Sequence, residues 1–328
     1  MRPNLTASKA GPLARLAPRS TLQWSTVATL LGLYAALIAA LSLLSPYFLS
    51  VNNFLNILLS VAIIGIISIG MTMLLISGGL DLSVGGVVAL VGVTIAGLGE
   101  RIGVNGAVGV ALLLGVLVGL INGFATTWVG INPLIATLAT LSLSRGLAFV
   151  FSGGLTQVVL DEGFGFWGRE SLLGVPVPVI IYLALFAVGF VVLRYTTFGR
   201  AIYAIGGNPQ ASRLASVRVK RIQRIVYLLC ALGAAVGGVV LTSQLAAGAP
   251  QAATGIELSV IAAVILGGTS LAGGSGSMIG TLLGVLIMGT LNNGLTLLSV
   301  DAYYQEIVRG LVLLLAVALD QLRKRDAA

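Results

Sequence analysis

The motif GLDLSV at residues 79–84 is repeated in a similar form, GIELSV, at residues 255–260. The same offset pairs Gly92 with Gly268, and it pairs the Ala-Gly step at 96–97 with the one at 272–273. After a gap of six residues the matches resume in the same order and include Asn122 with Asn292, and further on Arg145 matches Arg309. Glycine-rich and leucine-rich segments align easily by chance. A similar motif of six residues, followed by further matches in the same order, nevertheless indicates an internal repeat.

The repeat is made of membrane-spanning segments. Of the 328 residues, 57% are hydrophobic and only 9% are charged, whereas soluble domains carry about 25% charged residues. A helix needs about 20 apolar residues to cross a bilayer. Ten segments of this kind lie at 24–45, 54–76, 82–99, 106–128, 132–152, 177–194, 223–246, 256–272, 277–298 and 302–320. The sequence therefore predicts an all-α, polytopic membrane protein with about ten transmembrane helices.

Five spans fall in each half, at about 24–152 and 177–320. An odd number of spans turns the second copy upside down, which predicts an inverted 5+5 repeat of the kind that transporters build around a site at the midplane. We expect a cytoplasmic tail at 1–23, a transmembrane domain at 24–322 with a cytoplasmic loop at 195–222, and a second tail at 323–328.

Basic residues predict the orientation. The stretch 194–224 carries seven of the 18 basic residues, and no acid occurs between Glu170 and Glu257. Loops rich in Lys and Arg stay in the cytoplasm, so this loop and both termini should be cytoplasmic and 153–176 should be outside. Trp24 and Trp128 fall near predicted interfaces. The net charge of +8 follows this topology and does not indicate a nucleic-acid partner.

A docking helix is predicted within the basic loop. Asn208 and Pro209 suit a helix start, and Ala211, Leu214 and Ala215 then form an apolar stripe at helical spacing. A helix of about nine residues does not stand alone in water, so it should dock on something, and another protein is one candidate. The alternative is a loop that only fixes topology.

Polar residues at membrane depth are the other candidates for function, because a charge in lipid must face the bundle or a partner. Asp81 and Glu257 each open a helix, where they either fix the helix end or contact substrate. Glu306 and Arg309 are three residues apart and should pair within the membrane. The candidates for the translocation path or for helix ends are Asp81, Ser83, Asn122, Glu257, Ser259, Asn292 and Asn293.

Several chemistries find no support in the residues. The chain has no His and one Cys, which argues against a metal site and against most acid–base catalysis. The Gly-rich segment 267–276 lacks the Gly-Lys-Ser/Thr ending of a nucleotide-binding loop. Most of the 44 glycines should serve helix packing, because small residues let helices approach closely in lipid.

Four motifs also carry a resemblance to a known family. GMTMLLISGGLDLSVGG (70–86), AIGGNPQASRLASV (204–217), GIELSVIAAVILGGTSLAGG (255–274) and LNNGLTLL (291–298) resemble the membrane subunit of bacterial ATP-binding-cassette (ABC) importers for monosaccharides, most of all the ribose permease subunits. The resemblance covers about residues 42–322.

The resemblance implies a partnership in the inner membrane. The resemblance implies that two copies of the same permease chain form a pore. Two ATPase subunits, which hold ATP and Mg, dock on the cytoplasmic side, and a periplasmic binding protein delivers the sugar. The residues corresponding to the coupling region that contacts the ATPase are Gly206, Gly207, Asn208, Ala211, Arg213, Leu214, Ala215 and Val217. Pro209 stands where the family commonly has an acidic residue, and the particular sugar stays open.

Two other classes of function were weighed. A self-sufficient proton-coupled carrier or channel would need an isolated carboxylate or His in mid-span, and here the carboxylates lie near helix ends. An intramembrane enzyme would need a Ser/His or His/Glu constellation, which a chain without His cannot supply. Both are therefore secondary to a permease powered by a separate subunit.

Overall fold

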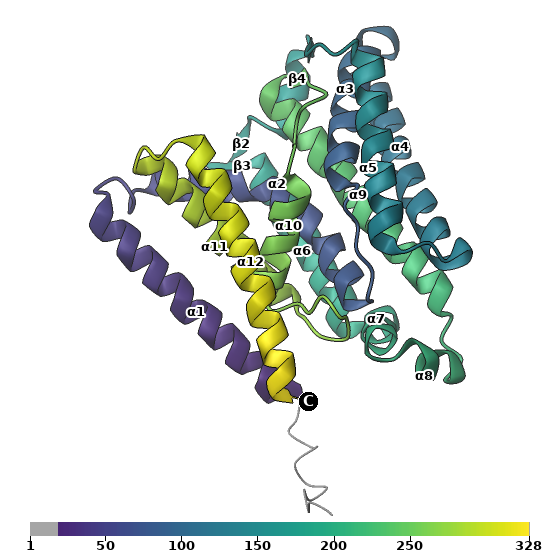
Figure 1. The fold of residues 1–328 in the computed structure, drawn as a ribbon. Helices are drawn as coiled ribbons and strands as arrows, with labels where there is room; N and C mark the ends of the chain where they lie inside the picture. Colours follow the sequence, from purple (N-terminus) through teal and green to yellow (C-terminus); the bar gives the residue numbers. More distant parts are fainter. Residues whose placement is uncertain (1–18, 328) are drawn as a thin grey trace, which may run out of the picture.

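The computed structural model describes residues 19–327, and these fold almost entirely into helices (Figure 1). Residues 1–18 of the predicted tail and the side chain of Trp24 lie outside what it describes. The helices are α1 Arg19–Leu44, α2 Val51–Ile76, α3 Val84–Ile102, α4 Val104–Phe124, α5 Pro133–Ser152, α6 Val177–Tyr195, α7 Thr197–Gly207, α8 Pro209–Leu214, α9 Val219–Leu245, α10 Ile256–Leu266, α11 Met278–Leu297 and α12 Ala302–Ala327. The predicted all-α, polytopic class is confirmed.

Eight helices in the described part are long and apolar enough to cross a membrane, namely α1 to α6, α9 and α11. A short π-helix, η2 Ala125–Val129, extends the fourth of these. The side chain of Trp128 in η2 is exposed and stacks on Phe124, as suits a residue at an interface. The tenth predicted span, 302–320, lies within α12, which continues to Ala327.

The predicted span at 256–272 is wrong in length. Helix α10 has 11 residues and ends at Leu266, and a loop follows up to Ser277. Gly267 approaches the backbone of Gly280 so closely that a Cβ would collide with it, and Gly268 has a positive φ of 86°. A right-handed helix does not continue through the positive φ at Gly268, so the apolar run from 256 divides into a short helix and a loop.

The two halves pack in matching pairs of helices. Helices α2 and α9 pack on each other at the centre, and the packing of α3 on α4, α5 and α9 is mirrored by that of α10 on α11, α12 and α2. The Gln223 side chain near the start of α9 donates to the Ser77 carbonyl just after α2, over 3.3 Å. These two equivalent helices therefore run in opposite directions, as an inverted repeat requires.

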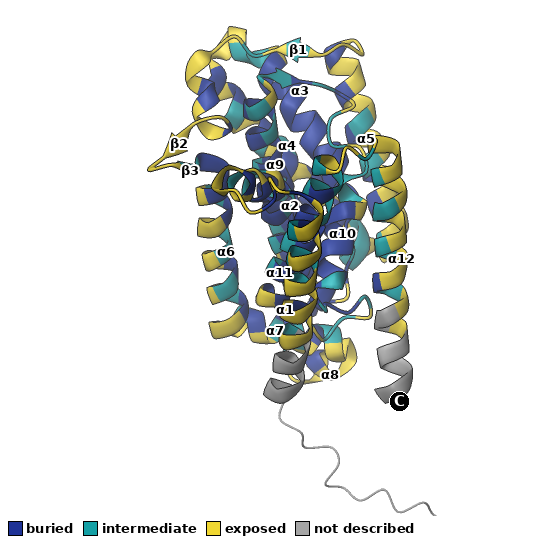
Figure 2. Cartoon of the chain, turned by 90° about the vertical axis from the view of Figure 1, so that its left-hand side faces the viewer, coloured by how far each residue is buried: buried dark blue, intermediate teal, exposed yellow. Residues whose placement is uncertain are grey.

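The first span of each half breaks this symmetry. Helix α1 packs on α11, whereas α6 packs mainly on α2. Only 11% of the apolar window of α1 is buried, against 72% for α2. Figure 2 shows the consequence, with α2, α9 and α10 in the buried centre and α1 and α12 on the exposed outside.

The two faces of the molecule differ in structure. One face carries α7, α8 and the ends of α1 and α12 (Figure 1). The opposite face carries a 3-10 helix, η3 Glu162–Trp167, and four short strands. Strand β1 Gln157–Val158 pairs with β4 Ala247–Gly248, and β2 Ser171–Leu172 pairs with β3 Val175–Pro176 in a hairpin. The segment predicted to lie outside thus holds this second face together.

Polar side chains cap the N-terminal ends of several helices. Asn132 accepts a hydrogen bond from the Leu134 backbone at the start of α5, 2.9 Å away, and Ser277 accepts from Gly280 at the start of α11. Each cap satisfies a backbone donor that the first turn of a helix leaves free. The local sequence therefore sets where these spans begin.

Candidate functional site

A buried polar cluster lies just before α3. The Oδ1 atom of Asp81 accepts hydrogen bonds from the backbone N–H of Ser83 at 2.8 Å, from the Ser83 hydroxyl at 2.6 Å and from Asn122 on α4 at 3.3 Å. Thr140 on α5 donates to Asn122 Oδ1 at 2.7 Å. Asp81, Ser83 and Asn122 are completely buried. The cluster ties the segment before α3 to α4 and α5.

Asp81 keeps one oxygen free of hydrogen bonds. Its Oδ2 atom is buried and has no partner within the described part of the chain. An acceptor of this kind is costly to bury in a protein interior, so the neighbouring bonds to Oδ1 are essential to hold the carboxylate there. The tyrosine hydroxyl of Tyr227 on α9 donates to the Leu80 carbonyl at 3.4 Å and closes the cluster on its other side.

The start of α10 comes up against the start of α3. A Cβ at Gly85 would collide with the Glu257 carboxylate, so the two helix starts meet closely at this glycine. Glu257 lies in the first turn of α10, where the helix dipole favours a negative charge. Its Oε2 atom is buried and has no hydrogen-bond partner.

Arg145 on α5 holds the segment that leads into α10. Its Nη1 atom donates to the carbonyls of Pro250 at 3.0 Å and Ala252 at 2.8 Å. The Glu257 carboxylate lies close enough to attract the guanidinium electrostatically. The second half of the chain is thus fastened to the first by a charged side chain.

The meeting point of α3 and α10 is deep in the bundle. From Gly85 to its end at Ile102, α3 rises about 26 Å at about 1.5 Å per residue. From Glu257 to its end at Leu266, α10 extends about 14 Å in the opposite direction. Two interrupted helices whose N-termini meet at membrane depth are the arrangement that transporters use at their binding sites.

The remaining predicted polar residues do not join the Asp81 cluster. Asn293 donates to Asn53 at 2.9 Å and so links α11 to α2. Asn292 points elsewhere, with its Oδ1 atom buried and unpartnered. Ser259 is mostly buried and makes a long bond to the carbonyl of Gly255.

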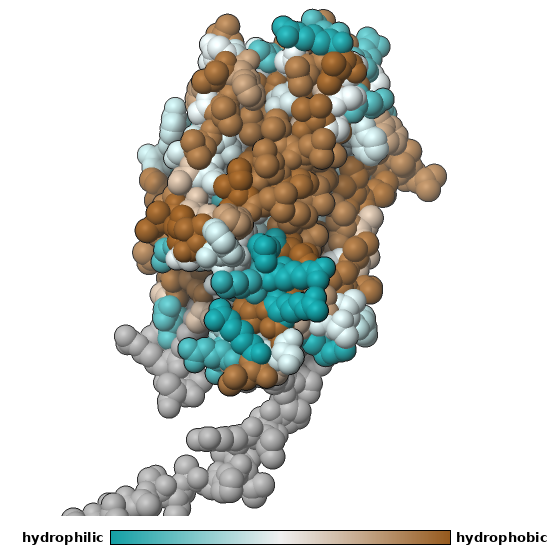
Figure 3. Space-filling model, turned by 90° about the vertical axis from the view of Figure 1, so that its right-hand side faces the viewer, coloured by the Kyte–Doolittle hydropathy of each residue, from teal (hydrophilic) through white to brown (hydrophobic). Residues whose placement is uncertain are grey.

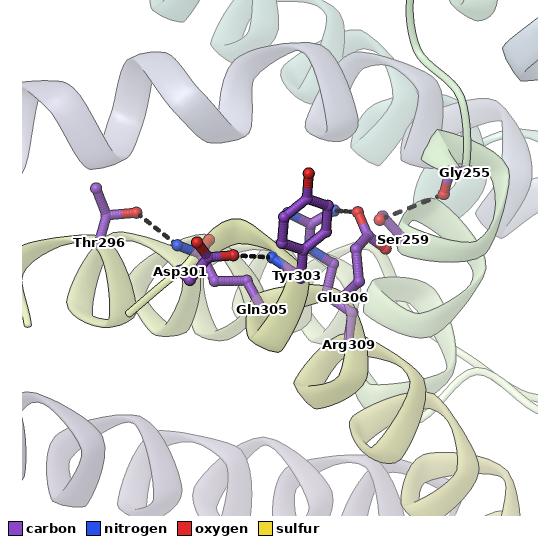
Figure 4. A network of polar contacts seen from close by, with 8 residues as sticks. All are labelled: Gly255, Ser259, Thr296, Asp301, Tyr303, Gln305, Glu306 and Arg309. Atoms are coloured by element: carbon purple, nitrogen blue, oxygen red, sulfur yellow. Dashed lines mark hydrogen bonds and ion pairs between the residues drawn. The ribbon is translucent and has the colours of Figure 1, made fainter. Parts of the chain in front are cut away.

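Glu306 and Arg309 form the pair that their spacing predicts. Arg309 Nη1 lies 2.7 Å from Glu306 Oε1, and Figure 4 shows the pair beside Ser259 of α10. The side chains of Glu306 and Arg309 are 66% and 31% exposed. This charged pair therefore lies on the surface of the single chain and not in its core.

The predicted docking helix is shorter than expected. Asn208 caps α8 by accepting from the backbones of Gln210 and Ala211 at 3.0 and 2.9 Å, but the helix has six residues instead of about nine. Ser216 has a φ of 63°, a conformation that no helix continues through. Val217 is therefore in the turn that follows.

Helix α8 nevertheless presents the predicted stripe to the surroundings. Leu214 is 90% exposed, and Gly207, Asn208, Ala211, Arg213 and Ala215 are exposed as well. In the described chain, Ser212 is the buried residue of this helix. A leucine that is exposed in this way on so short a helix is typical of a surface that binds another protein.

Helix α7 connects this surface to both interrupted segments. A Cβ at Gly206 would collide with the Ile76 carbonyl and with the backbone N–H of Gly274, and those two groups are bonded to each other at 2.8 Å. Tyr203 donates to the Gly276 carbonyl at 2.9 Å. Because burial raises the pKa of Tyr203, this donor keeps its proton.

Basic residues surround α8. Figure 3 shows them as a hydrophilic cluster below a broad apolar surface, and the residues are Arg213, Arg218, Lys220, Arg221 and Arg224 around an open cleft. An apolar band bordered by positive charge is what a cytoplasmic membrane surface selects. The cytoplasmic position of the basic loop stays a prediction.

Several residues of these sites were missed by the sequence prediction. Thr140 belongs to a buried stripe with Thr137 and Ser144 on α5, and small polar residues at helical spacing were a usable signal. Tyr203 and Gln223 carried no such signal, because their partners are backbone carbonyls of distant segments. Arg145 was identified from the sequence as the repeat match of Arg309, and its carbonyl partners were not predicted.

The polar groups described above can bind a solute and can shift together with the helices that carry them, but they do not suggest a catalysed chemical reaction. Within the described residues no group of three or more His, Cys, Asp or Glu could hold a metal ion. The polar groups are fixed at the ends of interrupted helices, and the exposed surface lies at the helix connected to them. The fold and the site together define an α-helical membrane permease.

The comparisons with known proteins agree with this class. The chain belongs to the family of permease components of the branched-chain amino acid transport system type, which matches residues 53–317. It is 45% identical over 307 residues to the ribose import permease protein RbsC of Bacillus subtilis, which covers 90% of this chain and 92% of that protein.

Two further relatives extend the comparison. RbsC of Escherichia coli K12 is 44% identical over 289 residues, covering 87% of this chain and 90% of the relative. The L-arabinose ABC transporter permease protein AraH of Azospirillum brasilense is 41% identical over 298 residues, covering 89% and 87%. No solved structure matches the chain.

Proposed function

We propose that this chain forms the translocation path for a monosaccharide in an ABC importer, and that ribose or a similar sugar is the substrate. Relatives at 41–45% identity carry the names of ribose and L-arabinose permeases, and they align over nearly their whole length. Energy comes from a separate ATPase subunit, which binds ATP and Mg. The family membership supports this function over a self-sufficient carrier or channel.

The observation that carries the proposal is the connection from α8 to the interrupted helices. Leu214 is free to enter a groove on an ATPase, and α7 behind it contacts the backbone after α2 and the loop after α10. A displacement of α8 would therefore move the segments that hold Asp81 and the C-terminal end of α10. Such a linkage would couple ATP hydrolysis to the site between the two helix starts.

The other parts of the proposed importer follow from the same assignment. A second copy of this chain completes the pore, and both termini and α8 face the cytoplasm of a bacterial cell across the inner membrane. A periplasmic sugar-binding protein docks on the opposite face. That face offers acidic residues such as Asp161 and Glu162, and an exposed hairpin tip at Leu173.

Leu214→Asp tests the docking of the ATPase. A charge at this position would be buried without a partner in the complex, at a cost of several kcal/mol, whereas the isolated permease should fold normally because Leu214 is exposed in it. We expect co-purification with the tagged ATPase and sugar uptake to be lost.

Two control variants accompany this test. Leu173→Asp makes the same substitution at an exposed leucine on the opposite face, so ATPase recovery should equal that of the wild type. Arg218→Ala should weaken recovery only slightly, because exposed charge contacts are worth about 0–1 kcal/mol. Equal ATPase recovery with Leu214→Asp and wild type would show that this loop serves topology alone.

A further inference from the structure

One flank of α12 exposes polar side chains close to α10. It consists of Tyr303, Glu306 and Arg309, and we refer to it as the polar flank. Tyr303 is 83% exposed, and its ring lies beside the Glu306–Arg309 pair in Figure 4. Ser259 in the first turns of α10 faces the same pair.

The polar flank lies at the depth of the interrupted helices. Leu313 of α12 packs in one apolar cluster with Ala262 and Ala263 of α10, so the two helices are aligned in depth. Arg309 lies one turn before Leu313, and Ser259 lies about one turn before Ala262. The ion pair is therefore level with the first turns of α10, and it lies about 6 to 11 Å along α12 from the start of that helix at Ala302.

Lipid is an unsuitable neighbour for this surface. A charged pair that faces hydrocarbon loses its hydration, and such residues in membrane proteins face a bundle interior or a water-filled cavity. Tyr304 and Leu311, which lie about 80–100° around α12 from Tyr303 and further still from Glu306 and Arg309, are exposed and largely apolar and provide a normal lipid-facing surface. The polar flank therefore borders water.

Several polar atoms around the flank have hydrogen-bonding capacity to spare. In the described chain, the buried atoms without a partner include Arg309 Nε and, on the neighbouring α11, Asn292 Oδ1. The guanidinium uses one N–H group on Glu306, while its planar fork can serve two acceptors at once. Donors and acceptors are thus available together at the position where the polar flank meets α10 and α11.

We propose that the polar flank, with Ser259 of α10, is the wall of the translocation path that binds the hydroxyl groups of the solute. A guanidinium fork and a carboxylate suit neighbouring hydroxyl groups, which both donate and accept hydrogen bonds. The ring of Tyr303 suits the apolar C–H face of a sugar ring. Arg309 and Glu306 then select polyhydroxylated solutes. This inference rests on the proposed function, because it assigns the sugar-contacting residues of that path.

Water accessibility gives the first test. Cys230 is the only cysteine of the chain, so a Cys230→Ala background allows single cysteines to be placed at Glu306 or, as the matched control, at Ile307 one residue away. In the assembled transporter in vesicles, we expect a membrane-impermeant thiol reagent to label position 306 rapidly. Position 307 should be labelled at least tenfold more slowly, and D-ribose with ATP should slow labelling at 306.

Transport kinetics give the second test, in proteoliposomes that contain the complete importer. Arg309→Lys keeps the charge but removes the planar fork, and we expect the apparent KM for D-ribose to rise about tenfold or more. Tyr303→Phe should change the relative uptake of ribose, arabinose and xylose only if its hydroxyl contacts the solute. The loss of the whole ring in Tyr303→Ala should raise KM, whereas Tyr304→Ala, the neighbouring exposed tyrosine on the other side, should not.

The outcomes separate this inference from the proposed function. If the wild-type complex transports sugar but position 306 resists labelling as position 307 does, or if Arg309→Lys and Tyr303→Ala keep the wild-type KM, the polar flank is not the wall of the path. If the wild-type complex with its ATPase transports no monosaccharide, the proposed function itself fails, whatever the labelling shows.

Discussion

The two halves of this permease carry the same kinds of polar residue at matching positions, but these residues differ in burial and in hydrogen bonding. In the first half, Asp81, Ser83 and Asn122 are completely buried and bonded to one another. In the second half, the equivalent Glu257 and Asn292 are partly exposed, although one oxygen of each is buried and, like Oδ2 of Asp81, has no hydrogen-bond partner in the described part of the chain. In the first half these polar residues hold the helices together, whereas in the second half they are accessible for other contacts.

The two arginines at equivalent positions show the same contrast. Arg145 donates to two backbone carbonyls of the other half, so its contacts are structural. Arg309 has one carboxylate partner from its own helix and a buried Nε atom without a partner. An inverted repeat can therefore keep one half as a scaffold while the other half changes its contacts during transport.

The strongest way to break this contrast is Asp81→Leu. The substitution leaves the backbone N–H and the hydroxyl of Ser83 buried without their acceptor, and each unsatisfied group costs about 1–3 kcal/mol. We expect a permease destabilised by about 3 kcal/mol or more, seen as a large fall in the thermal unfolding temperature in detergent and in poor insertion yield.

Glu257→Leu is the matched change in the second half. It removes a carboxylate with an oxygen that has no hydrogen bond, so the free energy of unfolding should change by less than about 1 kcal/mol, while sugar uptake should fall. Equal destabilisation by the two variants would contradict the division into anchor and available site.

Gly85→Val tests the contact where the two halves meet. The added side chain would collide with the Glu257 carboxylate, and overpacking of this kind typically costs about 1–3 kcal/mol. We expect lower thermal stability and slower uptake, measured in the same preparation. In the double variant with Glu257→Ala, most of the lost stability should return, since the colliding carboxylate is gone; persistence of the full loss would place the strain elsewhere.

A smaller effect is expected from Thr140→Val, which removes the hydrogen bond from α5 to Asn122 and keeps the shape of the side chain. Interhelical hydrogen bonds in membrane proteins contribute about 0.6 kcal/mol on average and at most about 1.7. The unfolding temperature should fall slightly. Tyr304→Phe, on the exposed side of α12, should leave it unchanged, and a larger loss there than at Thr140 would mean that α12 is buried by a partner in the preparation used.

Much of this architecture could be predicted from the sequence. The repeated motif at 79–84 and 255–260, together with five apolar spans on each side, was enough to predict an inverted repeat of helices, because an odd number of spans reverses the second copy. The basic run around α8 and the helix start at Asn208 were visible for the same reason: topology signals and capping depend on neighbouring residues.

Only the tertiary structure decided what each matching residue does. The apolar run from 256 ends as a helix at Leu266, where Gly268 takes a positive φ and Gly267 lies against the backbone of Gly280, a packing contact that the local sequence pattern does not predict. Asp81 and Glu257 look alike in sequence, but burial and hydrogen bonding depend on which distant helices surround them. Residue types and spacing specify local structure, whereas the exposure of a polar atom is a property of the whole packed bundle.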